Sequence, residues 1–315
     1  WPVGAMAEGL VADIGASHTR LALISEGALK PGSARRFLNA DFPGVLPMIA
    51  SYLHEQGAQP KAICAGVAGP VRAGRAQLTN LDWVIDGAEI ARATGAAEVH
   101  LINDLQAQGY ALDDLDPQSI TPIFSGQPDP DGPRMVLGLG TGSNIAVVHR
   151  VGADLLVPPA EAGHSGLPHL GDAANAVIAA LGAEVPHKPY EALLSGSGLM
   201  RLHRLRCGAS LTAPEILGQA EQAGGDCAET LTLFLEILGA VMGNLALTHM
   251  ATGGVFLIGG LARAMAPMLN APEFRGTFTA KGPYRPIMEA MPLYLITDDT
   301  AALIGCARYL RQRLK

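Results

Sequence analysis

The sequence predicts an α/β fold in which helices are combined with mixed β-sheets. One short pattern occurs twice, in residues 10–24 and 136–148: an apolar run, a turn of glycine and other small residues, and a second apolar run. Further along the chain, apolar strand-like runs alternate with segments that carry apolar residues at helical spacing. With 315 residues, the chain has the length of about two domains.

Apolar runs bounded by glycine or aspartate predict the strands, and several of these runs are rich in Val, Ile and Leu. The predicted strands are residues 10–15, 20–24, 62–67, 99–102, 136–139, 144–149, 255–258 and 292–296. Predicted helices are residues 46–57, 87–95, 172–183, 230–250 and 301–315. Asp86 and Glu89 have the spacing of a capping box that opens the second of these helices.

A polar, proline-rich stretch, residues 113–134, separates two α/β segments and predicts an inter-domain linker or a surface loop. We therefore expect a small lobe made of residues 9–114, to which the helix at 301–315 returns, and a large lobe made of residues 115–300.

Composition argues against several classes of partner. The net charge of −7 and the pI near 5.7 disfavour nucleic acid or an anionic membrane, because both select basic surfaces. The longest apolar stretch, residues 231–262, contains Glu236, Asn244 and His249, so we expect a buried helix followed by a buried strand rather than a membrane span. Residues 1–8 show no signal-peptide pattern and are left out of the argument.

The four cysteines, Cys64, Cys207, Cys227 and Cys306, lie far apart in the sequence and form no CxxC motif. They do not have the pattern of a disulfide framework or a zinc site. We expect reduced, mostly buried thiols, as in a cytosolic protein.

The two glycine turns are candidate phosphate sites. In the first, Asp13-Ile14-Gly15-Ala16-Ser17 occupies the position that Gly138-Leu139-Gly140-Thr141-Gly142 occupies in the second. A tight turn between two strands directs backbone N–H groups inward, and such an array binds phosphate. The second turn is followed by an apolar strand-like run rather than a helix, which disfavours a dinucleotide fingerprint, and the chain has no Walker A motif. Either turn alone is equally well explained by chain reversal, but two at matching positions favour a polyphosphate ligand.

Polar residues elsewhere are candidates for substrate binding. Asn103 and Asp104 follow a predicted strand, where α/β proteins bind ligands. Asp104 could accept a proton from a sugar hydroxyl or simply cap the following helix. Glu161 and His164 could bind hydroxyls or a metal, or be solvated loop residues, and Glu191 alone would be a surface residue. Gly259 and Gly260 would let a ligand approach the backbone closely, or form a structural turn.

Taken together and in order, these motifs resemble the bacterial glucokinase family. The resemblance covers nearly the whole chain. It rests on Asp13 to Arg20, Thr79-Asn80…Trp83, Ile102-Asn103-Asp104, Gly140-Thr141-Gly142, Glu161-x-Gly163-His164, Glu191…Ser195-Gly196, Gly253-Gly254-Val255-Phe256…Gly259-Gly260, and Pro292-Leu293-Tyr294-Leu295-Ile296…Asp299.

The resemblance implies an actin-like (ribonuclease H-like) fold of two α/β lobes with mixed central sheets and an active site in the cleft between them. It implies transfer of the γ-phosphoryl group of ATP to the 6-hydroxyl of glucose in the cytoplasm, with Mg²⁺ and a possible homodimer. By position, Asp104 is the general base. Asn103, Asp104, Glu161, His164 and Glu191 bind the sugar. Asp13, Gly15, Ser17, Thr141, Gly142, Gly259 and Gly260 bind the nucleotide, and Asp13 orients Mg²⁺ through water.

The chain departs from the family pattern at a few positions. Ala16 and Ala162 stand where glycine is usual, and Ser143-Asn144 stands where Leu-Gly is more usual. If the backbone at Ala16 needs a positive φ, the methyl group costs about 1–2 kcal/mol, which predicts an effect on ATP affinity or donor choice.

Three alternatives stay open: a sugar-binding regulator without catalysis, a kinase for another hexose, and a repressor/open-reading-frame/kinase protein. In the last of these families, the histidine of Glu-x-Gly-His joins a cysteine-rich zinc motif. This chain has no clustered cysteines to complete such a motif. We therefore expect His164 to contact a hydroxyl.

Overall fold

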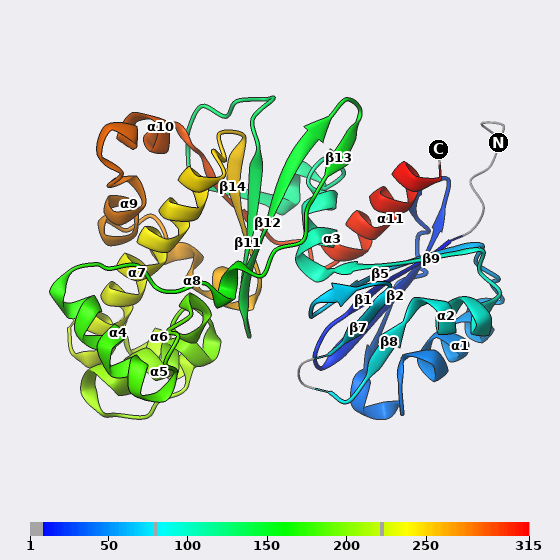
Figure 1. Ribbon diagram of the computed structural model, residues 1–315, viewed down its shortest axis with the longest axis horizontal. Helices are drawn as coiled ribbons and strands as arrows, with labels where there is room; N and C mark the ends of the chain where they lie inside the picture. Colours follow the sequence, from blue (N-terminus) through cyan, green and yellow to red (C-terminus); the bar gives the residue numbers. More distant parts are fainter. Residues whose placement is uncertain (1–8, 79–80, 221–223, 315) are drawn as a thin grey trace. The chain divides into compact units, whose positions relative to one another are not determined.

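The computed structural model describes residues 9–78, 81–220 and 224–314, and the chain divides into two compact units (Figure 1). Unit 1 contains the chain up to Pro117, residues 151–159 and the chain from Asp298 onward. Unit 2 contains residues 118–150 and 160–297. The lobes predicted from the sequence instead changed over at 114/115 and 300/301, and did not include residues 151–159 in the first.

Unit 1 is built on a mixed sheet in the order β3-β2-β1-β5-β9, and β4 also pairs with β2. Its strands are β1 (Gly9–Ile14), β2 (His18–Ser25), β3 (Ala28–Leu29), β4 (Arg35–Leu38), β5 (Ala62–Val67) and β9 (Glu98–Asn103). A small antiparallel sheet contains β6 (Val71–Arg72), β7 (Arg75–Gln77) and β8 (Val84–Asp86). The helices are η1 (Asn39–Asp41), α1 (Val45–Gln56), α2 (Gly87–Thr94), α3 (Asp104–Ala111) and α11 (Ala301–Arg313).

Unit 2 contains a second mixed sheet, with its strands in the order β10-β15-β14-β11-β12. These strands are β10 (Ile120–Phe124), β11 (Arg134–Leu139), β12 (Ser143–Val151), β14 (Gly254–Ile258) and β15 (Leu293–Ile296). The longer helices are α4 (Asp172–Glu184), α5 (Gly196–Cys207), α6 (Ala213–Ala220), α7 (Asp226–Thr248) and α9 (Pro272–Thr279). The shorter helical segments are η3 (Ala162–His164), η4 (Tyr190–Ala192), α8 (Gly260–Met265), η5 (Ala266–Met268), η6 (Gly282–Tyr284) and α10 (Arg285–Ala290). The remaining short elements are η2 (Pro117–Ser119), at the change from unit 1 to unit 2, and β13 (Asp154–Leu156), in the segment that belongs to unit 1.

The two sheets repeat one topology. In unit 1, β1 forms an antiparallel hairpin with β2 and runs parallel to β5, which runs parallel to β9. In unit 2, β11 forms an antiparallel hairpin with β12 and runs parallel to β14, which runs parallel to β15. The repeated sequence pattern is therefore the opening hairpin of each sheet, and the predicted α/β class with mixed sheets is confirmed.

Each unit has its own apolar core. In unit 1, β1, β2 and β5 pack against α1 and α2 through residues such as Ile14, Ile49 and Ile90. In unit 2, α7 lies at the centre, with α9 on one side and α5 and α6 beside it (Figure 1). By length and composition alone α7 could cross a membrane, but 72% of its most apolar window is buried inside the protein. The predicted buried helix is thus present.

The predicted elements are found, with one correction. Each of the predicted strands and helices corresponds to an element of the structure. Asp86 caps α2 as expected, because its carboxylate accepts the N–H groups of Ala88 and Glu89, but no bond from the Glu89 side chain to the Asp86 N–H is present among the described residues to complete a capping box. The stretch 113–134 is not wholly a linker or loop, since β10 pairs there with β15. Pro122 obscured this strand, and the pairing register shifts just after it, as is typical of proline on an edge strand.

We predict that Gly305→Ala destabilises unit 1. A β-carbon at this position of α11 would overlap the carbonyl oxygen of Ala107 in α3, so the two helices would have to separate. Such overpacking costs about 3 kcal/mol. Gly276→Ala in α9 is the control, because its β-carbon meets open space and alanine is favoured there by about 0.5–1 kcal/mol. Urea unfolding measures both, and equal midpoints for the two variants would contradict the packing argument.

Candidate active site

The first glycine turn, residues 15–17, is fixed by its own backbone and by Asn39. The Gly15 N–H donates to the carbonyl of His18 at 3.0 Å. The buried Asn39 donates from Nδ2 to the carbonyls of Gly15 and Ala16, at 2.9 and 3.3 Å. These bonds hold the turn in one conformation and engage its carbonyl oxygens.

The remaining donors of this turn are available to a ligand. Among the described residues, no protein acceptor binds the backbone N–H groups of Ala16 and Ser17. They are the donors that the turn can offer to an anion, whereas the N–H of Gly15, which we expected to face a phosphate, is used inside the turn. The expected strain at Ala16 is also absent. In the described part of the chain, positive φ occurs outside glycine only at Glu26, Ala73, Lys188 and Met250.

A buried carboxylate lies next to this turn. Asp13, at the end of β1, pairs with Arg20 of β2 at 3.1 Å, and its side chain is 16% exposed. Burial raises the pKa of the Asp13 carboxyl, Arg20 opposes that shift, and the charge of Asp299 adds to it. One or two carboxylates, with water and phosphate oxygens, are the ligands with which Mg²⁺ is usually held, so Asp13 and Asp299 fit a magnesium site.

Asn103 and Asp104 lie at the same edge of the sheet as the first turn, because Ile14, Val67 and Asn103 are paired across β1, β5 and β9. Asn103 caps α3: its Oδ1 accepts the Leu105 N–H at 2.9 Å, and Gln106 returns a bond to the Asn103 N–H at 3.0 Å. Asn103 Nδ2 also donates to the carbonyl of Gly69 at 3.2 Å.

The alternative role of Asp104 at the start of the helix is partly present: Asn103 is the cap residue, but Asp104 Oδ1 also accepts the Leu105 N–H, at 2.8 Å. Asp104 is the first residue of α3, one position after the cap. A carboxylate at this position interacts favourably with the positive end of the helix dipole.

The second turn, in unit 2, repeats these features. The Gly140 N–H donates to the Gly142 carbonyl at 3.0 Å, and the described residues supply no acceptor for the N–H groups of Thr141 and Gly142. Pairing of β11 with β14 brings Gly259 and Gly260 to the same edge. Gly259 has φ +116° and no room for a β-carbon, which would overlap the Leu139 carbonyl.

Glu191 is held directly by the second hairpin. The backbone N–H of Ser143 donates to Glu191 Oε2 at 2.7 Å. A β-carbon at Gly142 would lie 2.7 Å from the same oxygen, so this glycine makes room for the carboxylate. The turn thus organises Glu191 as well as its own N–H groups.

The loop of Glu161 and His164 packs onto the same hairpin. A β-carbon at Gly163 would overlap the Ser143 carbonyl oxygen, which explains the glycine in Glu-x-Gly-His. Partial burial raises the pKa of the Glu161 carboxyl, His164 opposes this, and Glu191 adds to it. The structure therefore brings together Glu161, His164 and Glu191 in unit 2 and leaves two acidic groups close enough to influence each other.

Two buried hydroxyls border this cluster. Among the described atoms, neither Ser143 Oγ nor Tyr190 Oη has a hydrogen-bond partner, although the two side chains are 4% and 2% exposed. Burial raises the pKa of the Tyr190 hydroxyl, and the charges of Glu191 and Glu161 add to this, while the neighbouring Ser143 hydroxyl opposes it. Tyr190 thus stays protonated beside the carboxylates.

Two residues next to the candidate site, Asn39 and Tyr190, had no recognisable sequence signal, and Ser143 and Asn144 were noted only as departures from the family pattern. Asp299 and Arg20 fell inside family motifs but were given no role. Thr79 and Asn80, part of one family motif, lie outside the described residues. Three of the four cysteines are buried, as expected. No group of three or more His, Cys, Asp or Glu that could hold a metal occurs within residues 9–78, 81–220 and 224–314.

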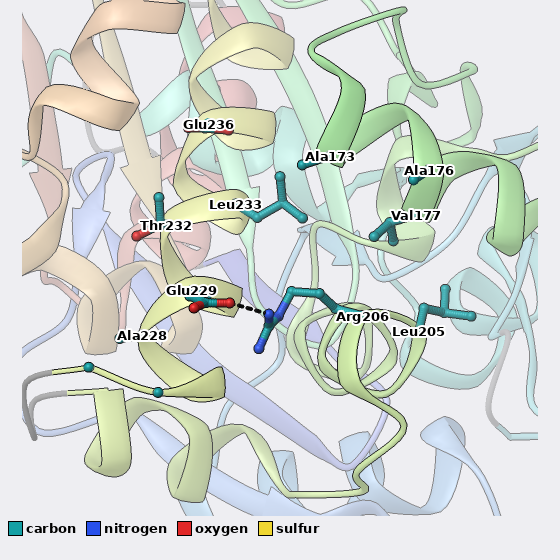
Figure 2. Close-up of a pocket in the computed structure, with 12 residues that line it drawn as sticks. Ala173, Ala176, Val177, Leu205, Arg206, Ala228, Glu229, Thr232, Leu233 and Glu236 are labelled. Carbon is teal, nitrogen blue, oxygen red and sulfur yellow. Dashed lines mark hydrogen bonds and ion pairs between the residues drawn. The ribbon is translucent and has the colours of Figure 1, made fainter.

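One cavity of the structure is separate from this site. It has a volume of about 570 Å³ and lies in unit 2 between α4, α5 and α7 (Figure 2). Its arginine, Arg206, is paired with Glu229 and Asp226, each at 2.6 Å. No residue predicted from the sequence to bind substrate or nucleotide lines it.

Two hairpin-led sheets with donor-bearing turns, and a carboxylate cluster on one of them, define a sugar kinase of the actin-like ATPase fold. The family model described as Glucokinase matches residues 10–313, and the chain belongs to that family. The glucokinase of Agrobacterium fabrum (strain C58) is 32% identical, over 96% of this chain and 91% of that protein.

Solved structures agree with this assignment. A glucokinase from an Antarctic psychrotroph has a TM-score of 0.86 and 31% identity, covering 98% of this chain and 99% of that chain. A ROK family glucokinase from Streptomyces griseus, solved in complex with glucose and AMPPNP, has a TM-score of 0.66 and 18% identity, with 97% and 99% covered. The second likeness shows the fold alone.

We predict that Asp13→Asn flattens the pH dependence of stability. Because the folded-state pKa of Asp13 is raised above 3.8, this group stabilises the fold below about pH 4 and that contribution is lost as the pH rises through the folded-state pKa. The amide removes this titration, and Arg20, at 27% side-chain exposure, can be solvated by water. Thermal unfolding from pH 4 to 8 should show a smaller decline for the variant than for the wild type. A steeper decline would mean that the Arg20 pair outweighs burial.

Proposed function

We propose that the protein is an ATP-dependent glucokinase that transfers the γ-phosphoryl group of ATP to the 6-hydroxyl of glucose, giving glucose 6-phosphate and ADP. One observation carries this proposal: the turn that offers the N–H groups of Thr141 and Gly142 also binds Glu191 and packs against the Glu161 loop. N–H groups that can bind a phosphate lie on this hairpin, and carboxylates that can bind sugar hydroxyls pack against it, an arrangement that suits a reaction joining a phosphoryl group to a sugar.

The sugar is bound through its hydroxyl groups. The carboxylates of Glu161 and Glu191 accept hydrogen bonds from sugar hydroxyls. His164 adds a further contact from the loop that contains Glu161. Hydrogen bonds to charged groups contribute about 1.5–3 kcal/mol each, so a pair of carboxylates supplies both affinity and orientation. Asn103 and Asp104 complete the set from unit 1.

Asp104 is the general base. Its carboxylate follows the cap of α3, and its Oδ1 accepts the Leu105 N–H at 2.8 Å. It accepts the proton of the 6-hydroxyl as the oxygen attacks the γ-phosphorus, and the bond between the γ-phosphorus and the β,γ-bridging oxygen breaks to release ADP. Phosphoryl transfer depends mainly on positioning and on stabilising charge on the phosphoryl oxygens.

The nucleotide phosphates are bound by the two turns. Ala16 and Ser17 of the first turn and Thr141 and Gly142 of the second offer backbone N–H groups, and Gly259 and Gly260 lie beside the second turn. Mg²⁺, when bound with ATP, would be held by Asp13 and Asp299 and would neutralise phosphate charge. Arg20 keeps Asp13 oriented rather than serving as the transition-state cation.

The competing roles have less support. A regulator without catalysis was suggested by Ala16, but the backbone there has no positive φ.

Cytoplasmic location and a homodimer remain part of the proposal, supported by the family alone.

We predict that Asp104→Asn lowers kcat by about 10³-fold, within the range for removal of a general base. Glucose binding, measured by calorimetry without nucleotide, should persist because Asn103 still caps α3. Asp172→Asn is the matched control: Asp172 is likewise the first residue of a helix, α4, and lies outside the proposed site. Near-normal turnover by Asp104→Asn in a coupled ADP-release assay would overturn the base assignment.

The substrate assignment is tested with a panel of hexoses and donors. We expect the highest kcat/KM for glucose with ATP, and lower values for mannose, fructose and amino sugars, because the carboxylates must match the positions of the hydroxyl groups. ADP and polyphosphate serve as alternative donors. A higher kcat/KM for another hexose, or for polyphosphate over ATP, would reassign the acceptor or the donor.

A further inference from the structure

The Asn144 side chain forms hydrogen bonds through both its amide nitrogen and its carbonyl oxygen to one short segment, residues 160–162. Its Nδ2 donates to the Ala160 carbonyl at 2.7 Å and to Glu161 Oε2 at 3.2 Å. Its Oδ1 accepts the Ala162 N–H at 2.9 Å. One carboxamide therefore binds three consecutive residues, and the middle one is a proposed sugar ligand.

That segment has little other local support at Glu161. Glu161 precedes η3 with φ −129° and ψ 52°, and its side chain makes no capping bond to that helix. Beyond it, the loop is tied to η4 through the Tyr190 N–H and the Ser165 carbonyl at 2.9 Å. Asn144 thus fixes the Glu161 end of the loop, and the Ser165–Tyr190 bond fixes the other end.

Adjacent residues of β12 hold the two carboxylates in different ways. Ser143 holds Glu191 through its backbone N–H, which any residue at that position except proline can provide. Asn144 holds Glu161 through its side chain, which the glycine more usual at this position in the family cannot provide. The contact is therefore a property of this chain's own sequence.

We propose that Asn144 is a positioning residue that sets sugar affinity by orienting the Glu161 carboxylate and the backbone of residues 160–162. This inference rests on the proposed function. It assigns Asn144 no contact with the reacting atoms. A residue of β12, the strand that follows the second glycine turn, would thus influence glucose affinity.

The main test compares Asn144→Ala with Asn175→Ala. Asn175 is a matched control: in the same unit, it accepts the Leu170 N–H at 2.9 Å and donates to the Leu170 carbonyl, outside the proposed site. We expect Asn144→Ala to raise both the glucose KM and the calorimetric Kd about tenfold, while kcat and the ATP KM stay within about twofold. Asn175→Ala should change none of these constants, even if it lowers the melting temperature as much as Asn144→Ala does.

Asn144→Asp gives a second readout that a purely structural role would not produce. The introduced carboxyl keeps an acceptor for the Ala162 N–H but places a second acid beside Glu161, which His164, Glu191 and Tyr190 also face. Two such carboxyls share a proton at lower pH, and the protonated one then donates as the amide does. The glucose KM of this variant should fall toward the wild-type value between pH 9 and 6. In the wild type, the glucose KM should instead rise as the pH falls and Glu161 becomes protonated.

The outcomes are distinguishable. A wild-type enzyme that phosphorylates glucose, together with an Asn144→Ala variant of unchanged glucose Kd, would overturn the inference and leave the proposed function intact. Equal changes in Asn144→Ala and Asn175→Ala would also overturn it. A wild-type protein that neither binds nor phosphorylates glucose would overturn the proposed function, and the inference with it.

Discussion

The backbone of Ser143 is the point of contact on which the candidate site in unit 2 depends. Its N–H group binds Glu191, and its carbonyl oxygen lies where only a glycine, Gly163, can approach. Both groups belong to a strand whose opposite edge is occupied by pairing with β11. A hydrogen bond from a fixed backbone donor to a carboxylate loses little side-chain freedom on the donor side, so the Glu191 carboxylate has a defined position before any ligand arrives.

Because the hairpin is duplicated, each unit has the same arrangement of backbone N–H groups and neighbouring residues. Both turns satisfy their first N–H internally, through Gly15 in one and Gly140 in the other, and the next two N–H groups have no protein acceptor within the described part of the chain. Both turns also lie where parallel strands end, so the residues that follow the neighbouring strands lie beside them. In unit 1 these neighbours are Asn103 and Asp104, and in unit 2 they are Gly259 and Gly260.

The features that could be predicted from the sequence are those that depend on local or repeated residue patterns. Strands rich in Val, Ile and Leu were visible in it, whereas β10 was not, because Pro122 interrupts its pattern. The candidate residues Asp104, Glu161 and Glu191 could be named, but their supports could not: Asn39 is 24 residues from Gly15, and Asn144 is 17 from Glu161. Hydrogen bonds between such distant residues leave no local pattern. The condition for strain at Ala16, a positive φ, is not met.

The packing of α11 has a consequence for the order in which the chain can fold. This helix, residues 301–313, contacts β1, β5 and α3, so the core of unit 1 contains residues separated by almost the whole sequence. Most of unit 2 lies in one continuous stretch and can fold as soon as it leaves the ribosome. Strands β1 and β5 are synthesised well before α11, and until that helix follows, the part of β1 and β5 that it covers is available to chaperones.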